Sequence, residues 1–450
     1  MDLLLTNIGL LATPIGLTAQ KGNAQRDTLQ LQNAMIGIKD GKIVYVGKQD
    51  ARQGDGSSAT RQGDGSSVFL ETSKSDNCCK IDKTDEPSPC LAPPPAFTPT
   101  RVVDCEGRLV TPGLVDSHTH LVFGGWRQNE LVLKLEGKSY LDILKSGGGI
   151  LSTVEHTRSA SEEELVEKGR ALLAEMLKLG VTTCEAKSGY GLNKADELKQ
   201  LRVMRKLNKA QPIDIISTFM GAHAVPKEYI DNRKGYIELL INEMLPAVAK
   251  DELAEFCDIF CETAVFTPNE SKHILEAAIK YGMTPKIHAD EIDPIGGAEI
   301  AAQVKAISAE HLIQASDQGI KALTEQNVIA VLLPATSFYL DKPYARARKM
   351  IEENVAVAIA TDFNPGSCPS LNMQLSMNLA CLKYKMTPAE ALTAATLNGA
   401  AAINKADICG SIEAGKQADL VIWDAPDLEY IFYRFGSNLV HTVIKDGEAV

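Results

Sequence analysis

The sequence predicts an α/β protein: a (β/α)8 barrel of the TIM type with a small β-sandwich domain formed from both chain ends. From residue 109 onward, short β-rich runs alternate with helical stretches, and eight such repeats are typical of a closed parallel barrel of about 250 residues. Both ends of the chain instead show the two-residue periodicity of half-exposed strands around Asp-Gly turns. We therefore expect residues 1–110 and 405–450 to form the β domain and residues 111–404 to form the barrel.

The two ends of the chain are expected to pair with each other. Residues 33–48 alternate apolar and polar side chains on either side of Asp40-Gly41, which is a strong hairpin signal. The tail segments GSIEAGKQADLVIWDA and HTVIKDGEAV return to this alternation, the second around Asp446-Gly447. We predict that the tail joins the N-terminal strands, so that one β domain brackets the barrel.

Residues from about 50 to 100 differ in composition from the rest of the chain. The heptapeptide RQGDGSS occurs at 52–58 and again at 61–67, followed by Ser, Asp, Cys and Pro with few large apolar residues. Such a segment cannot bury enough apolar surface to offset its chain entropy. We expect a mobile, low-complexity insertion within the N-terminal part of the β domain.

Eight β-rich runs are predicted to be the barrel strands, and helices between them carry clear start signals. Ser161 precedes Glu164 by three residues and Thr267 precedes Glu270 by three, which is the pattern of a capping box. Pro268 then occupies the first helical position. The predicted strands are residues 109–116, 181–188, 213–222, 258–266, 284–289, 306–311, 328–334 and 355–361.

The composition excludes several classes of function. With 46 basic and 58 acidic side chains the net charge is −12, and there is no basic stripe, which argues against nucleic acid as a partner. No apolar run approaches the ~20 residues of a membrane span, and Asp2 stands where a secretory signal would carry Lys or Arg. The ten cysteines include no C-x-x-C pair, so we expect reduced thiols in a cytoplasmic protein. A homodimer is compatible with such barrels, although no interface signal is visible.

Histidines gather at the ends of the predicted strands, where catalytic groups of such barrels lie. His118 and His120 close the first strand in PGLVDSHTHLVF, and their i, i+2 spacing places both imidazoles on one face. His288 ends the fifth strand in KIHADEID, and Asp362 ends the eighth in AIATDFNPGS. Three imidazoles and one carboxylate suit Zn²⁺ or Fe²⁺ and leave a position for water. We predict one divalent metal ion per chain.

Further polar residues are expected at the same mouth. Glu291 lies three residues beyond His288, and His311 and His223 end the sixth and third strands. One strand-end histidine is often only a core group, but two more facing one mouth favour chemistry. Arg127 follows in the first loop. A surface arginine is the commoner case, but in an acidic protein this guanidinium offers paired donors to the carboxylate of a small anionic substrate.

At these residues the sequence resembles the amidohydrolase superfamily, and within it the branch that opens the imidazolone ring in histidine degradation. Matching segments in the same order at so many separate loops are hard to obtain by accident. The resemblance extends to EAGKQADLVIW in the tail but not to the insertion, which the family lacks. The segments that carry it are PGLVDSHTHLVFGGWRQNE, GGGILSTVEHTR, EAKSGYGL, FMGAHAVP, KIHADEI, SAEHL and TDFNPGSCPS.

The resemblance implies hydrolysis of 4-imidazolone-5-propanoate to N-formimidoyl-L-glutamate by a mononuclear metal enzyme. Two-metal members of the superfamily often use a carboxylated lysine at the end of the fourth strand, and Glu262 there argues against that arrangement; Lys187, at the end of the second strand, suits a structural or an electrostatic role. The implied metal ligands are His118, His120, His288 and Asp362. The implied substrate contacts are Arg127, Tyr190, His223 and Glu291, with Tyr140 as a weaker candidate and Asn364, Gly366 and Ser367 in a loop that borders substrate and product.

The same residues suggest a mechanism. A bound metal ion can lower the pKa of water from 15.7 to about 7. We expect Glu291 or Asp362 to orient that water, accept its proton and return it to the leaving ring nitrogen. His311 and His223 would donate to the oxygen that becomes negative, an effect of roughly 3 kcal/mol for one well-placed donor. Arg127 would hold the propanoate and fix the ring at the metal.

Three alternatives stay open from the sequence alone. A metal-dependent deaminase of a cyclic amidine would use the same ligands and the H-x-x-E pattern of His288 and Glu291, and release of ammonia would identify it. A binuclear hydrolase of the dihydroorotase or hydantoinase type would need two bound metals per chain. A non-enzymatic scaffold of the same fold would commonly have lost ligands, whereas all four are present here.

Overall fold

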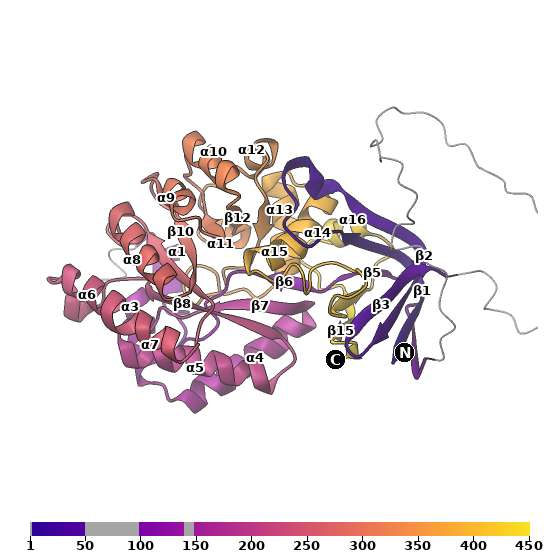
Figure 1. Cartoon of the computed structure of the whole chain (residues 1–450), viewed down its shortest axis with the longest axis horizontal. Helices are drawn as coiled ribbons and strands as arrows, with labels where there is room; N and C mark the ends of the chain where they lie inside the picture. The colour runs from indigo at the N-terminus through magenta and orange to yellow at the C-terminus, as the bar shows by residue number, and fades with distance from the viewer. Residues whose placement is uncertain (1, 50–98, 139–147) are drawn as a thin grey trace, which may run out of the picture.

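The computed structural model describes residues 2–49, 99–138 and 148–450, which form a barrel and an adjoining mixed sheet (Figure 1). The predicted insertion lies almost entirely outside the described residues, and so does Tyr140. Within the described ranges, no helix combines the length and the apolar character needed to cross a membrane.

The barrel consists of eight parallel strands that neighbour one another in chain order. The ring is closed just beyond the first and last strands, where Thr119 and Phe363 form a parallel bridge. There His120 N donates to the Phe363 carbonyl at 2.8 Å, and Asp362 N donates to the His118 carbonyl at 3.0 Å. The strands are β6 (Leu114–Asp116), β7 (Val181–Lys187), β8 (Asp214–Ala222), β9 (Phe256–Cys261), β10 (Thr284–Ala289), β11 (Ser308–His311), β12 (Ile329–Leu332) and β13 (Val357–Ile359).

Helices between successive strands cover the outside of the barrel, as Figure 1 shows for α4, α5 and α8. The capping boxes predicted at Ser161 and Thr267 are present at the starts of α4 and α8. α4 buries Leu165, Leu172 and Met176 on one face, the spacing of an amphipathic helix. The helices are α1 (Glu130–Leu135), α3 (Ile150–Ser159), α4 (Glu162–Lys178), α5 (Lys194–Ala210), η2 (Lys227–Tyr229), α6 (Arg233–Leu239), η3 (Leu240–Met244), α7 (Leu245–Lys250), α8 (Pro268–Lys280), α9 (Gly297–Gln303), α10 (Asp317–Gln326), α11 (Pro334–Tyr339), α12 (Ala347–Glu352), α13 (Met373–Tyr384), α14 (Pro388–Ala395), α15 (Leu397–Ala402) and α16 (Leu428–Tyr433).

The second body is a mixed sheet built from both ends of the chain, as predicted. Its strand order is β16-β15-β14-β5-β1-β2-β3, with β4 also paired to β1. The antiparallel pairing of β14 with β5 joins the tail to the N-terminal part. Both Asp-Gly turns have two consecutive residues with positive φ, at 50° and 72° for Asp40-Gly41 and 51° and 78° for Asp446-Gly447. The strands are β1 (Leu3–Pro14), β2 (Thr28–Lys39), β3 (Lys42–Lys48), β4 (Arg101–Asp104), β5 (Leu109–Pro112), β14 (Leu420–Trp423), β15 (Val440–Lys445) and β16 (Glu448–Ala449), and η1 (Gly22–Arg26) links β1 to β2.

Two predicted barrel strands differ from those observed. The run 109–116 is divided at Gly113 between β5 of the mixed sheet and β6 of the barrel, because Gly113 N donates to Asp419 O of the tail at 2.8 Å. A β-carbon at Gly113 would collide with the Thr182 side chain, so only glycine allows this close passage. The run 258–266 is β9, Phe256–Cys261, and the chain then turns so that Glu262 N donates to Phe266 O at 3.0 Å.

Candidate metal centre and active site

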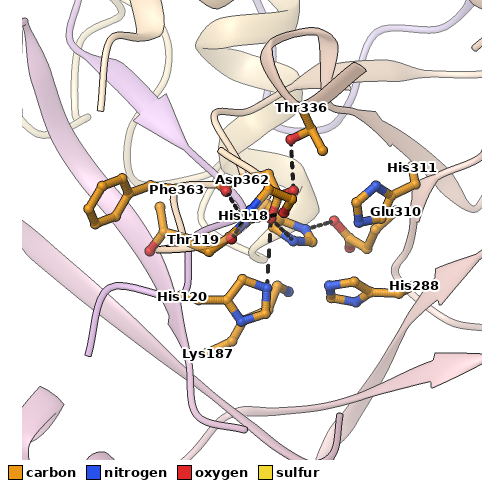
Figure 2. Close-up of polar contacts among 12 residues, drawn as sticks. His118, Thr119, His120, Lys187, His288, Glu310, His311, Thr336, Asp362 and Phe363 are labelled. Carbon is orange, nitrogen blue, oxygen red and sulfur yellow. Dashed lines mark hydrogen bonds and ion pairs between the residues drawn. The ribbon is translucent and has the colours of Figure 1, made fainter. Parts of the chain in front are cut away.

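The four predicted metal ligands converge at the mouth of the barrel (Figure 2). Asp362 Oδ1, which follows β13, lies 3.4 Å from His118 Nε2 and 3.7 Å from His120 Nε2, both of which follow β6. The ring of His288, on β10, is centred 4.6 Å from that of His118. Residues from the first, fifth and eighth barrel strands therefore meet at one point.

The ligand atoms form two overlapping groups in which they all lie within 4.8 Å of one another: His118, His288 and His311, and His118, His120 and Asp362. All five side chains are buried. His311, which the sequence suggested as an oxyanion donor, is thus also close enough to be a ligand.

The polar atoms of this cluster fit a cation. Within the described chain, Nε2 of His118, both ring nitrogens of His288, Nδ1 of His120 and Nδ1 of His311 are buried without a hydrogen-bond partner. Buried polar atoms without partners are costly, and so many in one place need an explanation. Nitrogen ligands together with one carboxylate are the set that Zn²⁺ and Fe²⁺ prefer, and a divalent ion would give one nitrogen of each ligand ring a partner.

The protonation of the histidines supports the same interpretation. Burial holds the pKa of His118, His120 and His311 well below the ordinary histidine value, helped by neighbouring positive charge. Burial likewise lowers the pKa of His223 to about 3. These imidazoles are therefore neutral, and a neutral ring has the lone pair that a metal ligand needs.

The two carboxyl groups at the mouth shift in the opposite direction. Burial raises the pKa of Asp362 to about 6, although Thr336 Oγ1 donates to its Oδ2 at 2.7 Å and opposes the shift. Burial, with repulsion from Asp362 and Glu262, raises the pKa of Glu291 to about 8. Glu291 Oε2 lies 3.6 Å from His311 Nε2. Two carboxyl groups that hold protons this differently are suited to proton transfer.

Glu262 stabilises the loop that carries Glu291 through hydrogen bonds. Its carboxylate accepts from Ile292 N at 2.8 Å and from Asp293 N at 3.2 Å. Glu262 does not belong to either group of ligand atoms within the described chain. It therefore fixes the position of Glu291.

His223 lies beside the metal cluster and stacks on His120, with ring centres 4.9 Å apart and planes 17° apart. Tyr190 is centred 5.3 Å from His223 and borders the same space. His223 Nδ1 is 3.1 Å from the Gly189 carbonyl. A carbonyl only accepts, so Nδ1 carries the proton and Nε2 of the neutral ring is an acceptor. The donor role expected from the sequence would need a second proton on this ring.

Arg127 is held by a residue that the sequence reasoning missed. Its Nε and Nη2 donate to the two carboxylate oxygens of Glu130, each at 2.9 Å. Glu130 also accepts from Gly149 N at 2.6 Å. The Nη1 side of the guanidinium faces Gly366, where any β-carbon would overlap it. The Arg-x-x-Glu spacing in RQNE was the available signal for this pair.

The loop after Asp362 folds around Asn364. The side-chain oxygen of Asn364 accepts from Gly366 N at 2.8 Å and from Ser367 N at 2.7 Å, while its Nδ2 donates to the Asp362 carbonyl at 2.7 Å. Asn364 therefore links the position of a ligand to the loop that faces Arg127. Of the residues predicted for the site, only Tyr140 lies outside the described residues.

Known proteins resemble this chain over nearly its full length. Residues 109–450 match the model of the amidohydrolase family. The chain is 48% identical to an imidazolonepropionase of Bacillus cytotoxicus, over 99% of this chain and 96% of the relative. It is equally similar to an imidazolonepropionase of Bacillus velezensis, over 100% and 97%.

Solved structures share the fold at low sequence identity. A zinc-bound adenosine deaminase from Xanthomonas campestris matches with a TM-score of 0.67 and 21% identity, over 100% of this chain and 92% of that one. A 5-methylcytosine deaminase from Klebsiella pneumoniae matches with a TM-score of 0.68 and 15% identity, over 99% and 97%. These matches and the strand order confirm the predicted barrel with its added β domain. The chain belongs to the amidohydrolase family, and within that family to the imidazolonepropionases.

Proposed function

We propose that this protein opens the ring of 4-imidazolone-5-propanoate by hydrolysis and releases N-formimidoyl-L-glutamate, a reaction of histidine degradation. The observation that carries the proposal is the buried convergence of His118, His120, His288 and Asp362, with ring nitrogens that lack any other partner. That cluster lies in a chain 48% identical over nearly its full length to proteins named for this reaction.

His118, His120, His288 and Asp362 would hold one divalent ion, Zn²⁺ or Fe²⁺. When bound, such an ion lowers the pKa of water toward 7 and polarises a carbonyl oxygen. The lowered pKa values of His118 and His120, which leave both rings neutral, support this assignment. The zinc in the related adenosine deaminase structure is consistent with it.

Arg127 would bind the propanoate carboxylate of the substrate. Glu130 fixes the guanidinium through two hydrogen bonds, so little side-chain entropy is lost when the anion arrives. Because the chain carries a net charge of −12, a local cation is needed to hold an anion at this mouth. The aromatic ring of Tyr190, buried beside His120 and His223, would border the imidazolone ring.

Glu291 would carry the proton during ring opening. Asp362 is less suited, since its Oδ1 faces His118 and His120 and its Oδ2 accepts from Thr336. The raised pKa of Glu291, about 8, lets its carboxyl group both take and return a proton near neutral pH. Glu291 would accept a proton from the attacking water and give it to the leaving ring nitrogen.

The two remaining histidines would orient the substrate. His223 would accept an N–H of the imidazolone ring at Nε2, since its Nδ1 proton is directed at Gly189. His311, 3.6 Å from Glu291, would face the oxygen on which negative charge develops. Together they would fix the ring between Arg127 and Glu291.

The deciding experiment gives purified, metal-analysed protein the imidazolone and follows the product by mass spectrometry. The expected product is heavier than the substrate by one water and matches formiminoglutamate. His118→Asn, which removes a predicted ligand, serves as the inactive control. An unchanged imidazolone in the presence of metal-loaded protein would reject the proposal, and ammonia released from cytosine or adenosine instead would identify a deaminase.

We also place the enzyme in the cytoplasm, where a catabolic hydrolase meets its substrate. The cysteines in the described part of the chain are free thiols, which supports a reducing compartment. Association into a homodimer stays a prediction.

A further inference from the structure

Five charged side chains form a continuous line through the barrel interior beneath the metal cluster. In order they are Glu310, Lys286, Glu185, Lys187 and Asp258, and we call them the charge chain. All five are fully buried. Their signs alternate along the line, beginning and ending with a carboxylate. They come from strands β11, β10, β7 and β9, and none of them is among the proposed metal ligands.

The links of the charge chain are short. Lys286 Nζ lies 3.4 Å from Glu310 and 3.1 Å from Glu185. Lys187 Nζ lies 2.7 Å from Glu185 and 2.7 Å from Asp258. Glu185, at the centre, also accepts from Thr218 Oγ1 at 2.5 Å. Each buried charge therefore has an opposite charge beside it, which is the condition for keeping charges inside a protein.

Both ends of the charge chain contact ligand histidines. Glu310 Oε2 lies 2.7 Å from Nδ1 of His118, and Asp258 Oδ2 lies 3.1 Å from Nδ1 of His288. A carboxylate only accepts, so the hydrogen bond to Glu310 keeps the proton of His118 on Nδ1, and the negative charge of Asp258 favours the same tautomer of His288. The opposite nitrogens, Nε2 of both histidines, are buried without a hydrogen-bond partner. Nδ1 of His288 also makes no hydrogen bond within the described residues, so its contact with Asp258 is electrostatic. The charge chain thus leaves the Nε2 lone pairs of His118 and His288 available to one ion.

The net charge of the charge chain also favours a bound cation. With all five groups ionised in their ion pairs, three carboxylates and two ammonium groups give 2 − 3 = −1 for the charge chain. This single excess negative charge lies next to the ligands in a region that water does not screen, where its effect on a cation is large. A lysine or glutamate that touches no ligand can therefore change how tightly the ion binds.

We propose that the charge chain positions His118 and His288 and sets the affinity of the site for a divalent cation, with Glu185 as the positioning residue that couples its two ends. The inference rests on the metal site of the proposed function. It extends that site to residues that bind neither metal nor substrate.

The test measures zinc affinity of the full-length protein by competition with a chromophoric chelator. Glu185→Gln keeps the side-chain shape but raises the charge-chain total from −1 to 0. We expect zinc affinity to fall about 10- to 100-fold, the range found when residues behind metal ligands are changed. Asp419→Asn is the matched control, because it breaks a buried ion pair with Lys445 in the mixed sheet, 3.2 Å long, and should leave zinc affinity unchanged.

A double variant separates charge from packing. Glu185→Gln combined with Lys187→Met returns the total to −1, so zinc affinity should recover toward that of the unmodified protein. A purely structural role predicts the reverse, because the double variant loses more contacts than the single one. A double variant that binds zinc as weakly as Glu185→Gln, or a single variant that matches Asp419→Asn, would overturn the proposal.

A measurement on the unmodified protein covers the case in which Glu185→Gln does not fold. Nitrogen-15 spectra of the histidine-labelled, zinc-loaded protein should show His118 and His288 protonated at Nδ1 and bound through Nε2. A proton on Nε2 of either ring would overturn the proposal. If the unmodified protein binds no divalent metal at all, the proposed function itself fails, which is a different result from unchanged affinity in the variant.

Discussion

The Nη1 atom of Arg127 occupies the space that a β-carbon at Gly366 would need. Arg127 comes from the loop after the first barrel strand and Gly366 from the loop after the last, and Glu130 prevents the guanidinium from turning aside. Gly366 is not among the glycines with positive φ, so its backbone conformation permits alanine, and the closest contacts that oppose the added β-carbon are with the Arg127 guanidinium. The glycine leaves room for the group that we propose binds the substrate carboxylate.

We expect Gly366→Ala to raise KM about tenfold or more while metal content stays unchanged, since it displaces Arg127 and touches no ligand. Steady-state kinetics together with metal analysis of the same sample measures both quantities. Arg127→Ala should also raise KM, and its effect on metal content should be smaller. Loss of metal in the Arg127 variant would contradict the assigned role.

A double-mutant cycle connects these two residues. If Gly366→Ala acts by displacing the guanidinium, it should add almost nothing in the Arg127→Ala background. Fully additive effects on kcat/KM would show that the alanine disturbs something other than Arg127.

His223→Phe should separate catalysis from metal binding. Phenylalanine keeps a flat ring against His120 but removes Nε2, so we expect metal content to stay near that of the unmodified protein and kcat/KM to fall about 10²- to 10³-fold. Glutamine, which retains an acceptor, should restore part of the loss. His223→Phe with no bound metal would instead place His223 among the ligands.

Removal of the metal should lower the melting temperature of the protein. Ligand at about 100 times its dissociation constant stabilises the folded state by about 2.7 kcal/mol, and the metal-free protein also retains unpartnered buried nitrogens. Calorimetry before and after chelation, and again after addition of Zn²⁺ or Fe²⁺, measures the shift. In His120→Asn the chelator should produce little change, and an equal shift in that variant would argue against the assigned site.

Glu390 should make the stability of the folded protein depend on pH in the acidic range. Its buried carboxylate lies 2.8 Å from Arg26 and 2.6 Å from Arg348. Burial alone would raise the pKa of Glu390, but these arginines and the Thr387 N–H hold it at about 2, compared with 4.5 for an ordinary glutamate. A lowered folded-state pKa stabilises above pH 4.5, and this contribution is lost as the pH falls from about 4.5 to 2.

Glu390→Gln should therefore cost roughly 2 kcal/mol at pH 7, an amount reduced because both arginines are partly exposed. The difference from the unmodified protein should shrink as the pH falls below about 4.5. Urea unfolding at several pH values measures it. Glu163→Gln, which changes an exposed acid 4.0 Å from Lys206, should show no such difference. A Glu390→Gln deficit that is constant with pH would reject the explanation.

The sequence predicted those parts of the molecule that depend on local pattern. The barrel strands, the two Asp-Gly turns and the capping boxes at Ser161 and Thr267 follow from periodicity and short motifs. The meeting of His118 with Asp362 followed from the rule that strand ends of a barrel share one mouth.

Contacts between distant side chains could not be predicted in the same way. Asp258 lies within an apolar strand and Glu310 within the short strand SAEH, and a charge in such a position does not reveal which partner it meets across the barrel. The clamp of Glu130 on Arg127 and the tautomer of His223 likewise depend on backbone atoms of Gly149 and Gly189 that only the fold brings near. The sequence pattern located the site, but the hydrogen bonds within it could be identified only from the folded structure.

The bridge between Thr119 and Phe363 has a mechanical consequence for the whole barrel. The wall between the first and last strands is completed by two backbone hydrogen bonds, which flank His118, His120 and Asp362. An ion bound by those three side chains would hold the first and the last barrel strands together at this seam. Amide protons along this seam should then exchange with solvent faster in metal-free protein, while those of β8 and β9, which carry no proposed ligand, change less.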